Sequence, residues 1–587
     1  MTKNDMTFKM GGEAGQGVES TGAGFAKALA RAGLRIFGLQ DYMSRIRGGY
    51  NFFQVRVSEE VSYCHTDRVH LLMAFNQEAI EQHLDEMAEG GGIIFDPRLK
   101  VDQEGLKARG TQAFAVPLIQ IAQEEGGNKI MMNTAAVGAA AGVTDLPLEY
   151  IAGVIEDNFG RKKGAAIAEA NLKVAKAAYR FAQDNYAAGF EWKLEPVEAP
   201  ERMVINGNHA ICLGALAAGC RFISAYPMTP ATSIIEWMSA HAAKFGIVTK
   251  QTEDEIAAIN MAIGAAHVGA RAMTATSGGG FSLMVEALGM AGMTETPLVV
   301  VEAQRVGPST GMPTRTEQGD LLFVLHASQG EFPRIVLTPG TVEQCFEVGA
   351  RAFNLAETYQ CPVIILTDNF LANSLRSVDK EAFDFGAVEI DRGQFLTEEQ
   401  LDQLDDGYKR HLITDSGISP RALPGHPKAV FTVTSDEHDE VGHMADEDPV
   451  NRIRQAQKRW RKMETARQED MRGPEVYGPA EADMTFVSWG STYGPVREAV
   501  DRLNAQGAKT NFLHFVDIWP FPEEKAGPLI ESAKVLVAVE NNMTGQLAQF
   551  IRTHTGRAVD HEVLRYDGRP FSPEYILAHL EEVNPHA

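Results

Sequence analysis

Four short runs in the middle of the chain carry the side chains best able to do chemistry. They are ISAYPMTPAT (223–232), QTEDEIAAINMAIGAAHVGA (251–270), TATSGGGFSLM (274–284) and VVVEAQRVGPSTGMPTRTEQGD (299–320). Each run stands where a predicted strand ends or a predicted helix begins, which is where the ligand sites of α/β proteins form. Their carboxylate, guanidinium and hydroxyl groups could bind an anion or transfer a proton.

Each run taken alone also has a purely structural explanation. Pro227 and Pro230 could only shape a loop, and the TSGGG turn could cradle a phosphate or let a strand meet a helix closely. Glu255 begins an alanine-rich helix, and a lone glutamate there most often complements the helix dipole. Arg305 could form a surface salt bridge, but it directly follows the buried strand PLVVVEAQ and is therefore well placed for a site.

The elements around these runs alternate between strand and helix over 204–375. The predicted strands are FISAYP, ARAMTATS, PLVVVEAQ, RIVLTP and PVIILTD, with alanine-rich helices between them. This alternation predicts an α/β fold with a doubly wound, mostly parallel sheet.

The N-terminal segment, 1–192, also begins as an α/β domain. A strand is expected over 6–10, followed by the glycine-rich turn GGEAGQG and a helix, with later strands at 70–75 and 91–96 and a helix over 160–185. GGEAGQG departs from the dinucleotide fingerprint G-x-G-x-x-G, and no clear acidic ribose partner follows it. A nucleotide-dependent dehydrogenase is therefore disfavoured.

Two changes of composition divide the rest of the chain. The run 193–203 has two prolines and several charges and is expected to be a linker. The segment 376–480 is charged and contains RIRQAQKRWRKMETARQED. It is either a connector that docks on a partner or a loosely ordered surface linker. A smaller α/β domain is expected over 481–587.

The composition excludes several classes of protein. The chain has 587 residues, 44% hydrophobic and 22% charged, as in soluble multidomain proteins, and its net charge of -24 disfavours nucleic acid as a partner. No metal or iron–sulfur site is expected, because no two of the five cysteines form C-x-x-C. Without a signal-like N-terminus or about 18 consecutive apolar residues, a cytoplasmic protein that does not enter the membrane is expected. The cysteines are Cys64, Cys212, Cys220, Cys345 and Cys361.

The four central runs, in this order, resemble the pyrimidine-binding domain of the 2-oxoacid:ferredoxin oxidoreductases, which depend on thiamine diphosphate. The resemblance covers essentially the whole chain. Residues 1–192, with GGEAGQG and SRIRGGYNFFQ (44–54), resemble the gamma domain, and 481–587 resemble the transketolase-like C-terminal domain. A gamma domain ahead of an alpha domain is the layout of the two-subunit type, similar to the alpha subunit of 2-oxoglutarate:ferredoxin oxidoreductase.

The resemblance implies roles for particular residues. Glu255 matches the glutamate that binds N1′ of the aminopyrimidine, and Tyr226 and Pro227 lie in the loop beside the cofactor. A carboxylate at N1′ stabilises the imino form of the 4′-amino group, which can then take the C2 proton. Thr229 matches a threonine near the substrate carboxylate. Arg305 matches the arginine that binds this carboxylate with two parallel hydrogen bonds.

Two further contacts are expected. Ser309, Thr310 and Arg315 are candidates for the distal carboxylate of 2-oxoglutarate, although a lid or subunit-contact loop explains 307–320 equally well. The resemblance also places the gamma domain near coenzyme A. Arg45 and Arg47 could meet the phosphates of coenzyme A, but two arginines beside a Gly-Gly turn are also ordinary surface residues.

A second chain must complete the expected enzyme. The sequence has no G-D-G motif of the kind that holds the diphosphate through Mg²⁺, and no cysteine set for a cluster. The resemblance therefore implies a beta subunit that brings Mg²⁺ and a 4Fe-4S cluster, with thiamine diphosphate between the two chains. We expect a dimer of heterodimers that reduces ferredoxin.

The expected reaction converts 2-oxoglutarate and coenzyme A to succinyl-coenzyme A and CO₂ while ferredoxin is reduced. The reverse direction would fix carbon by carboxylating succinyl-coenzyme A. The alternative substrates are pyruvate and the branched-chain 2-oxoacids. A non-catalytic scaffold is the alternative from another class, but the joint presence of Thr229, Glu255 and Arg305 argues against it.

Overall fold

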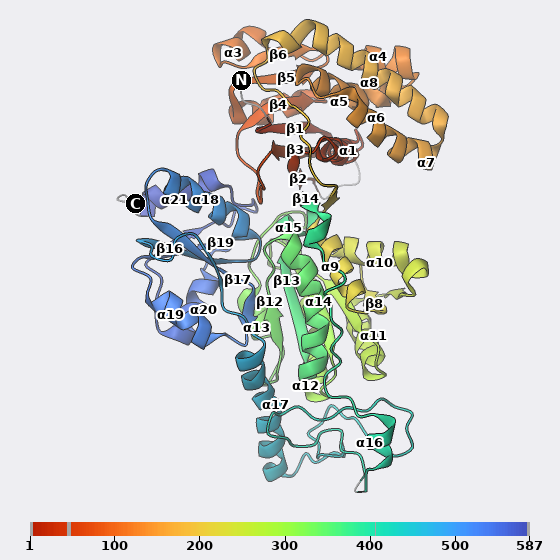
Figure 1. Ribbon diagram of the computed structural model, residues 1–587, viewed down its shortest axis with the longest axis vertical. Coiled ribbons are helices and arrows are strands. Elements are labelled where there is room, and N and C mark those ends of the chain that lie inside the picture. The colour runs from red at the N-terminus through yellow and green to blue at the C-terminus, as the bar shows by residue number, and fades with distance from the viewer. Residues whose placement is uncertain (1–3, 44–47, 406, 584–587) are drawn as a thin grey trace. The chain divides into compact units, whose positions relative to one another are not determined.

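The structure is a computed structural model that describes residues 4–43, 48–405 and 407–583 (Figure 1). The chain forms two compact units. The N-terminal unit comprises Met1–Asn206 together with Asn373–Ala382, and the C-terminal unit comprises Gly207–Ala372 together with Phe383–Ala587. The short segment Asn373–Ala382, which straddles the expected boundary at 375, therefore belongs with the N-terminal residues.

The N-terminal unit is built on one eight-stranded sheet of mixed direction. Its strands run in the order β6 (Gln112–Ala115), β5 (Met87–Phe95), β4 (Val69–Ala74), β1 (Met6–Glu13), β3 (Tyr50–Ser58), β2 (Arg35–Asp41), β14 (Leu375–Asp379) and β7 (Arg202–Ile205). The first four strands are parallel, and every pair from β1 to β7 is antiparallel. The expected parallel α/β arrangement thus holds for only half of this sheet.

The first strand is longer than its apolar residues indicated. β1 continues through Gly11 and Gly12, which pair with Phe52 and Asn51 of β3. A Cβ atom on Gly11 would lie 2.1 Å from the Tyr50 hydroxyl, so glycine is needed there for close contact and not for a turn. The turn itself begins only after Glu13.

Helices cover the N-terminal sheet and pack closely on one another. In α5 (Met132–Val143), a Cβ atom on Gly138 or Gly142 would lie 2.3 Å from a backbone oxygen of α8 (Ala165–Tyr186). Small residues thus allow the two helices to touch, and their alanines join the core of the unit. The other helices are α1 (Val18–Arg31), α2 (Gln77–His83), α3 (Gln103–Ala108), α4 (Leu118–Gly126), α6 (Leu148–Ile155) and α7 (Arg161–Lys163).

The C-terminal unit contains the doubly wound sheet that the sequence predicts. Seven strands run in the order β18 (Asp517–Trp519), β12 (Ile335–Leu337), β13 (Pro362–Asp368), β11 (Leu298–Gln304), β10 (Ala272–Thr276), β8 (Phe222–Ala225) and β9 (Val248–Gln251), all parallel except β18. The α/β fold class is confirmed. The helices between them are α9 (Gly207–Ala217), α10 (Thr232–Phe245), α11 (Glu255–His267), α12 (Gly278–Met293), α13 (Leu321–Leu325), α14 (Val342–Tyr359) and α15 (Asn369–Asn373).

A second, five-stranded sheet completes this unit. Its order is β15 (Glu475–Tyr477), β17 (Thr510–Phe515), β16 (Met484–Trp489), β19 (Leu536–Glu540) and β20 (His561–Leu564), with helices α18 (Tyr493–Ala505), α19 (Glu523–Glu531), α20 (Gln546–Thr555) and α21 (Pro573–Val583). One apolar core runs through both sheets. The two parts also exchange backbone and side-chain bonds: Gln318 N donates to Asn541 O at 2.7 Å, and Asn541 N donates to Gln318 Oε1 at 3.0 Å.

The charged connector packs on its own chain. Besides α16 (Glu398–Asp402), it forms the long helix α17 (Pro449–Glu469), which begins with a side-chain cap from Asp448. Lys458 and Lys462 of α17 are fully buried, and their ammonium groups pair with the buried carboxylate of Glu295. The basic run is therefore an ordered helix held by buried ion pairs, and not a loose surface linker.

No helix in the described part of the chain is long and apolar enough to cross a membrane.

Candidate active site

Glu255 lies at the first position of α11, directly after β9. The side chain of Asp254 caps this helix by accepting a hydrogen bond from Ala257 N at 2.8 Å, and Glu255, in the first turn, also complements the helix dipole. Glu255 is 3% exposed, and its Oε1 atom has no hydrogen-bond partner among the described residues. Because an unsatisfied buried oxygen is costly, this atom points to a donor from outside the chain. The protonated N1′ atom of an aminopyrimidine is such a donor, and the site fits it.

The glycine-rich turn makes room for this carboxylate. A Cβ atom on Gly280, in the first turn of α12, would lie 2.1 Å from Thr276 Oγ1 and 2.7 Å from Glu255 Oε1. Gly280 itself has ordinary helical backbone, so the requirement for glycine is steric and not conformational. The TSGGG run is thus a place where β10 meets α12 closely, at the edge of the Glu255 side chain.

The proline-rich loop after β8 is held against Arg305. Arg305 Nη1 donates to the backbone oxygen of Thr229 at 2.9 Å, and Asn208 Nδ2 donates to Pro230 O at 2.9 Å. The Thr229–Pro230 peptide bond is cis. These bonds hold the backbone of Thr229 beside Arg305, so the two residues predicted to bind one substrate group lie close together. The other predicted loop residues differ in exposure: Pro227 is half-buried, whereas Tyr226 is 38% exposed.

A cavity of about 480 Å³ opens beside Arg305. Its walls include Arg305, Ser309 and Thr310, which come from the predicted site, and the glycines at the start of α12. Burial lowers the pKa of Arg305, and no carboxylate among the described residues pairs with it. A guanidinium that faces a cavity without a counter-ion is suited to bind an anion.

Arg315 does not belong to the residues that line this cavity. Its backbone oxygen accepts a hydrogen bond from Val306 N at 3.3 Å, and the turn between them is closed by a bridge between Val306 and Met312. The Arg315 side chain packs instead beside Gly568, where an added Cβ atom would lie 3.1 Å from Arg315 Cβ. Of the three residues predicted for a second carboxylate, the structure brings together Ser309 and Thr310 only.

Two acidic residues of this region were not singled out from the sequence. Glu302 of β11 is fully buried, both of its carboxyl oxygens lack hydrogen-bond partners, and burial raises its pKa well above the usual range. Asp320 lines the same cavity as Arg305, and burial raises its pKa to about 6. A charged residue in the middle of the apolar strand VVVEAQ was the one sequence signal that could have identified Glu302.

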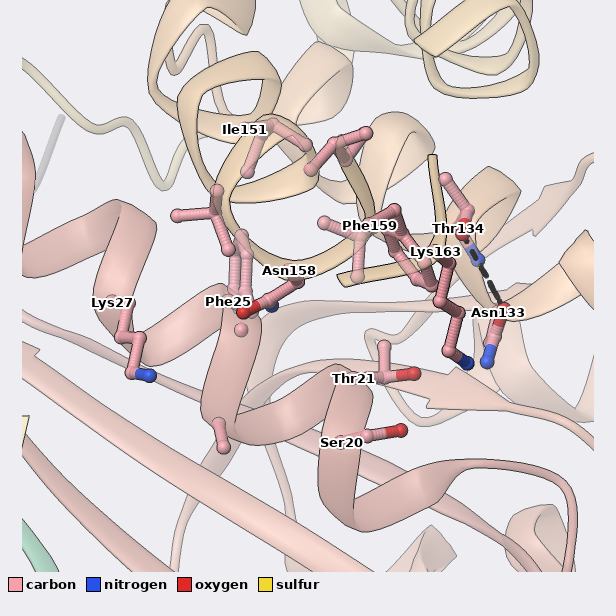
Figure 2. A pocket seen from close by; sticks show the side chains of 15 residues that line it. Ser20, Thr21, Phe25, Lys27, Asn133, Thr134, Ile151, Asn158, Phe159 and Lys163 are labelled. Atoms are coloured by element: carbon pink, nitrogen blue, oxygen red, sulfur yellow. Dashed lines mark hydrogen bonds between the residues drawn. The ribbon is translucent and has the colours of Figure 1, made fainter. Parts of the chain in front are cut away.

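The N-terminal unit has a cavity of its own, of about 420 Å³ (Figure 2). Figure 2 shows the hydroxyls of Ser20 and Thr21 on the same side as the Lys163 amine and the Asn133 amide. Phe25, Ile151 and Phe159 line its apolar part, so the cavity suits an anion with an apolar body. The two arginines predicted for coenzyme A, Arg45 and Arg47, lie outside the described residues.

One buried cluster has the residue types of a metal site. Ligand atoms of Glu295, His411 and His438 lie within 4.8 Å of one another. However, the same carboxylate pairs with Lys458 and Lys462 and accepts a hydrogen bond from His411 Nδ1 at 3.0 Å. Two ammonium groups at the carboxylate oppose a divalent cation there, so the cluster is explained by its role in holding α17.

Three family profiles match the chain in sequence order. Pyruvate ferredoxin/flavodoxin oxidoreductase matches 7–181, pyruvate flavodoxin/ferredoxin oxidoreductase, thiamine diP-bdg, matches 213–458, and pyruvate:ferredoxin oxidoreductase core domain II matches 482–576. The second of these covers Thr229, Glu255 and Arg305. The thiamine diphosphate-binding region is thus the one that contains the unpartnered glutamate.

Curated relatives match over nearly the whole chain. The 2-oxoacid:ferredoxin oxidoreductase subunit alpha of Sulfolobus sp is 33% identical, covering 96% of this chain and 95% of its own. The 2-oxoglutarate oxidoreductase subunit KorA of Mycobacterium tuberculosis is 31% identical, covering 93% and 87%.

A solved structure matches in fold and length. It is the 2-oxoglutarate:ferredoxin oxidoreductase from Magnetococcus marinus with 2-oxoglutarate, coenzyme A and succinyl-CoA bound. The two chains are 35% identical with a TM-score of 0.92, and the match covers 99% of this chain and 100% of that one.

Proposed function

The chain belongs to the 2-oxoacid:ferredoxin oxidoreductase family as an alpha subunit, and from this premise we propose that its substrate is 2-oxoglutarate. Together with a beta subunit, it would convert 2-oxoglutarate and coenzyme A to succinyl-coenzyme A and CO₂ and reduce ferredoxin, or run the reverse, CO₂-fixing reaction. The Magnetococcus marinus structure and the KorA relatives support this substrate. Relatives named only for 2-oxoacids keep pyruvate and the branched-chain acids as alternatives.

The observation that carries the proposal is the buried, unpartnered Oε1 atom of Glu255. Thiamine diphosphate, when bound, supplies a nucleophilic carbon and an electron sink for decarboxylation. Glu255 would hold the aminopyrimidine by accepting a hydrogen bond from its protonated N1′ atom, with Tyr226 and Pro227 in the loop beside the ring. The helix cap by Asp254 leaves the Glu255 carboxylate free for this bond.

Arg305 and Thr229 would bind and orient the substrate. The guanidinium neutralises the carboxylate next to the keto group, and its hydrogen bond to Thr229 O keeps the proline-rich loop at the same place. For the distal carboxylate of 2-oxoglutarate, Ser309 and Thr310 are the better candidates, because they line the cavity beside Arg305. Arg315 would support that loop through its packing beside Gly568.

A beta subunit would complete the enzyme. The chain has no G-D-G motif, and all five cysteines are buried and unpaired with one another. We therefore assign Mg²⁺, the diphosphate site and the 4Fe-4S cluster to the beta subunit, with a dimer of heterodimers as the assembly and ferredoxin as the electron acceptor. The name "alpha subunit" of the Sulfolobus relative supports an assembly of several chains.

Coenzyme A would approach through the N-terminal unit. In the described part of that unit, hydroxyls, an amide and an ammonium group converge at the cavity of Figure 2. Lys163, which has no carboxylate partner among the described residues, is suited to a phosphate. Arg45 and Arg47 remain candidates for the other phosphates.

The experiment that tests the proposal is an anaerobic assay of the complex purified from its own cell. Coenzyme A-dependent reduction of a viologen dye is followed with a panel of 2-oxoacids. We expect strong reduction with 2-oxoglutarate and little with pyruvate. A preference for pyruvate or a branched-chain acid would overturn the assignment of 2-oxoglutarate as the substrate. Absence of reduction by a complex that contains thiamine diphosphate and iron would favour the scaffold.

A further inference from the structure

We propose that Asp320 is a further catalytic residue, which takes the proton that the thiol of coenzyme A loses when the thioester forms. The inference rests on the proposed function and adds to it a base for the acyl-transfer step. The carboxylate of Asp320 lies in the wall of the cavity beside Arg305, and its contacts do not explain a structural role.

The position of Asp320 is fixed by its backbone. Its backbone nitrogen donates to Gln304 Oε1 at 2.9 Å, and Gln304 Nε2 is held in turn by Thr367 O at 3.1 Å. The carboxylate reaches the start of α12, where a Cβ atom on Gly278 would lie 2.4 Å from Asp320 Oδ2. The turn therefore leaves space for this side chain at the wall of the cavity that Arg305 also lines.

The carboxylate itself is unpaired. Asp320 precedes α13, but it makes no side-chain cap to that helix. Across the described ranges no donor or cation bonds to its oxygens, so neither capping nor an ion pair accounts for the residue. A partly buried carboxylate that faces a cavity without a partner is able to accept a proton from a bound molecule.

Burial of Asp320 favours proton uptake at a useful pH. The charged groups that face Asp320 are Arg305 in the same cavity, Glu302 from β11 and Glu317 from the preceding loop. Burial raises the pKa of Asp320 to about 6. A base with such a pKa is ionised at neutral pH and still binds a proton readily.

Burial of Glu302 favours its protonated form, which supports this assignment. It is fully buried, and its pKa is raised well above the usual range by burial and then by the charges of Asp320 and Asp368. Neighbouring carboxyl groups do not both ionise easily. The protonated form of Glu302 is thereby favoured, and Asp320, which lines the cavity, is the carboxylate placed to accept a proton from a bound molecule.

The proposed step moves one proton to Asp320 and one acyl group to sulfur. The S–H bond of coenzyme A would break and an O–H bond would form on Asp320, while sulfur would form a C–S bond to the acyl carbon. The bond from that carbon to its carrier, thiamine diphosphate, would break, and its electron pair would return to the carrier as the leaving group. Ferredoxin, the oxidant of the proposed reaction, would take up the two electrons left by decarboxylation, through the cluster assigned to the beta subunit. Asp320 then releases its proton to solvent through the cavity. One proton per turnover is thereby accounted for.

The test compares two half-reactions in the complete complex with its beta subunit. Asp320→Asn is expected to lower kcat/KM for coenzyme A by about 100-fold, in the range of general base catalysis. It should also remove an acid limb near pH 6 from the pH profile of the wild type. Release of CO₂ from the 2-oxoacid without coenzyme A, measured in a single turnover, should stay within about twofold of the wild type, since that step releases no thiol proton. Glu286→Gln, at an exposed carboxylate of α12, is the control and should keep the limb.

Two results would overturn the assignment. One is a pH profile of Asp320→Asn that still shows the limb near pH 6. The other is an equal loss in both half-reactions, which would indicate a structural role. If the wild-type complex shows no coenzyme A-dependent reaction with any 2-oxoacid, the proposed function fails, and this outcome is separate from a failure of Asp320.

Discussion

Gly280 lies so close to Glu255 that a Cβ atom added to it would stand 2.7 Å from the Glu255 Oε1 atom. The two residues belong to different helices, α12 and α11, whose first turns meet at the carboxyl ends of the central strands. The carboxylate is therefore confined on one side by a residue that has no side chain. This contact makes the position of the carboxylate testable without changing the carboxylate itself.

Replacing Glu255 with Gln should lower the activity of the complex by at least about 100-fold, because an amide cannot hold the proton that the cofactor exchanges. The direct measurement is hydrogen–deuterium exchange at C2 of bound thiamine diphosphate, followed by NMR. Glu253→Gln, two residues earlier and exposed, is the control and should behave as the wild type. Full activity of the Glu255 variant would remove it from the mechanism.

The glycine contact gives a matched pair of variants. Gly280→Ala should displace the Glu255 carboxylate and weaken thiamine diphosphate binding, since its Cβ atom would meet Thr276 Oγ1 at 2.1 Å. Gly279→Ala is the control, because its nearest neighbour would be 3.9 Å away. Calorimetric titration of each complex with the cofactor measures the difference. Equal affinity in the two variants would contradict the steric argument.

Loss of the Arg305 charge should lower kcat/KM for the substrate and leave the binding of the cofactor unchanged. Arg305→Gln removes a charge-assisted hydrogen bond of about 1.5–3 kcal/mol, which corresponds to a roughly 10- to 100-fold lower kcat/KM for the 2-oxoacid. Affinity for thiamine diphosphate should stay constant. Arg221→Gln, at an exposed arginine of the same unit, serves as the control. An unchanged kcat/KM for Arg305→Gln would mean that another group binds the substrate carboxylate.

The central sheet could be predicted from the sequence because its strands are buried on both faces. PLVVVEAQ and PVIILTD are continuous apolar runs, and they form β11 and β13. Edge pairings could not be predicted in this way. β14 (LRSVD) has no apolar run, and its place between β2 and β7 depends on contacts between residues far apart in the chain.

The site shows the same limit at the level of single residues. Arg315 stands near Ser309 and Thr310 in sequence, but the turn at Val306 and Met312 directs it toward Gly568. Asp320 was passed over because its neighbours across the cavity come from another strand and another helix. Motifs locate a site, whereas the turns between strands decide which side chains enter it.

The buried ion pairs of α17 should contribute strongly to stability. Glu295→Ala would leave Lys458 and Lys462 buried without a counter-charge, and a loss of roughly 3–5 kcal/mol is expected. Urea unfolding measures this change. Lys534→Ala, at a pair that is 67% and 65% exposed, should leave the free energy of unfolding nearly unchanged, because solvent screens an exposed pair. Similar losses in both variants would show that burial of the pair is unimportant.

Stability should fall in mild acid because of His514. Burial lowers its pKa to about 3, and both of its ring nitrogens lack partners among the described residues. In the unfolded chain the His514 ring binds a proton near pH 6.5. The stability that depends on the neutral ring is therefore complete above that pH and is lost as the pH falls toward 3. Through His514, the free energy of unfolding should change by at most about 1.4 kcal/mol per pH unit.

His514→Asn should flatten the pH dependence of urea unfolding, because the amide does not titrate. His443→Asn, at a histidine whose side chain is 71% exposed, is the control and should leave the slope unchanged. An equal slope in the wild type and in His514→Asn would assign the acid sensitivity to other groups.

The return of the chain to β14 has a consequence for biosynthesis. β14 (Leu375–Asp379) lies between β2 and β7 in the sheet. Until the ribosome has passed Ala372, β2 and β7 each have one edge whose backbone groups lack this partner strand. Open edges of this kind invite pairing with other nascent chains. A gene divided after Asn206 would yield a first product with that exposed gap, unless the codons for Asn373–Ala382 were appended to it.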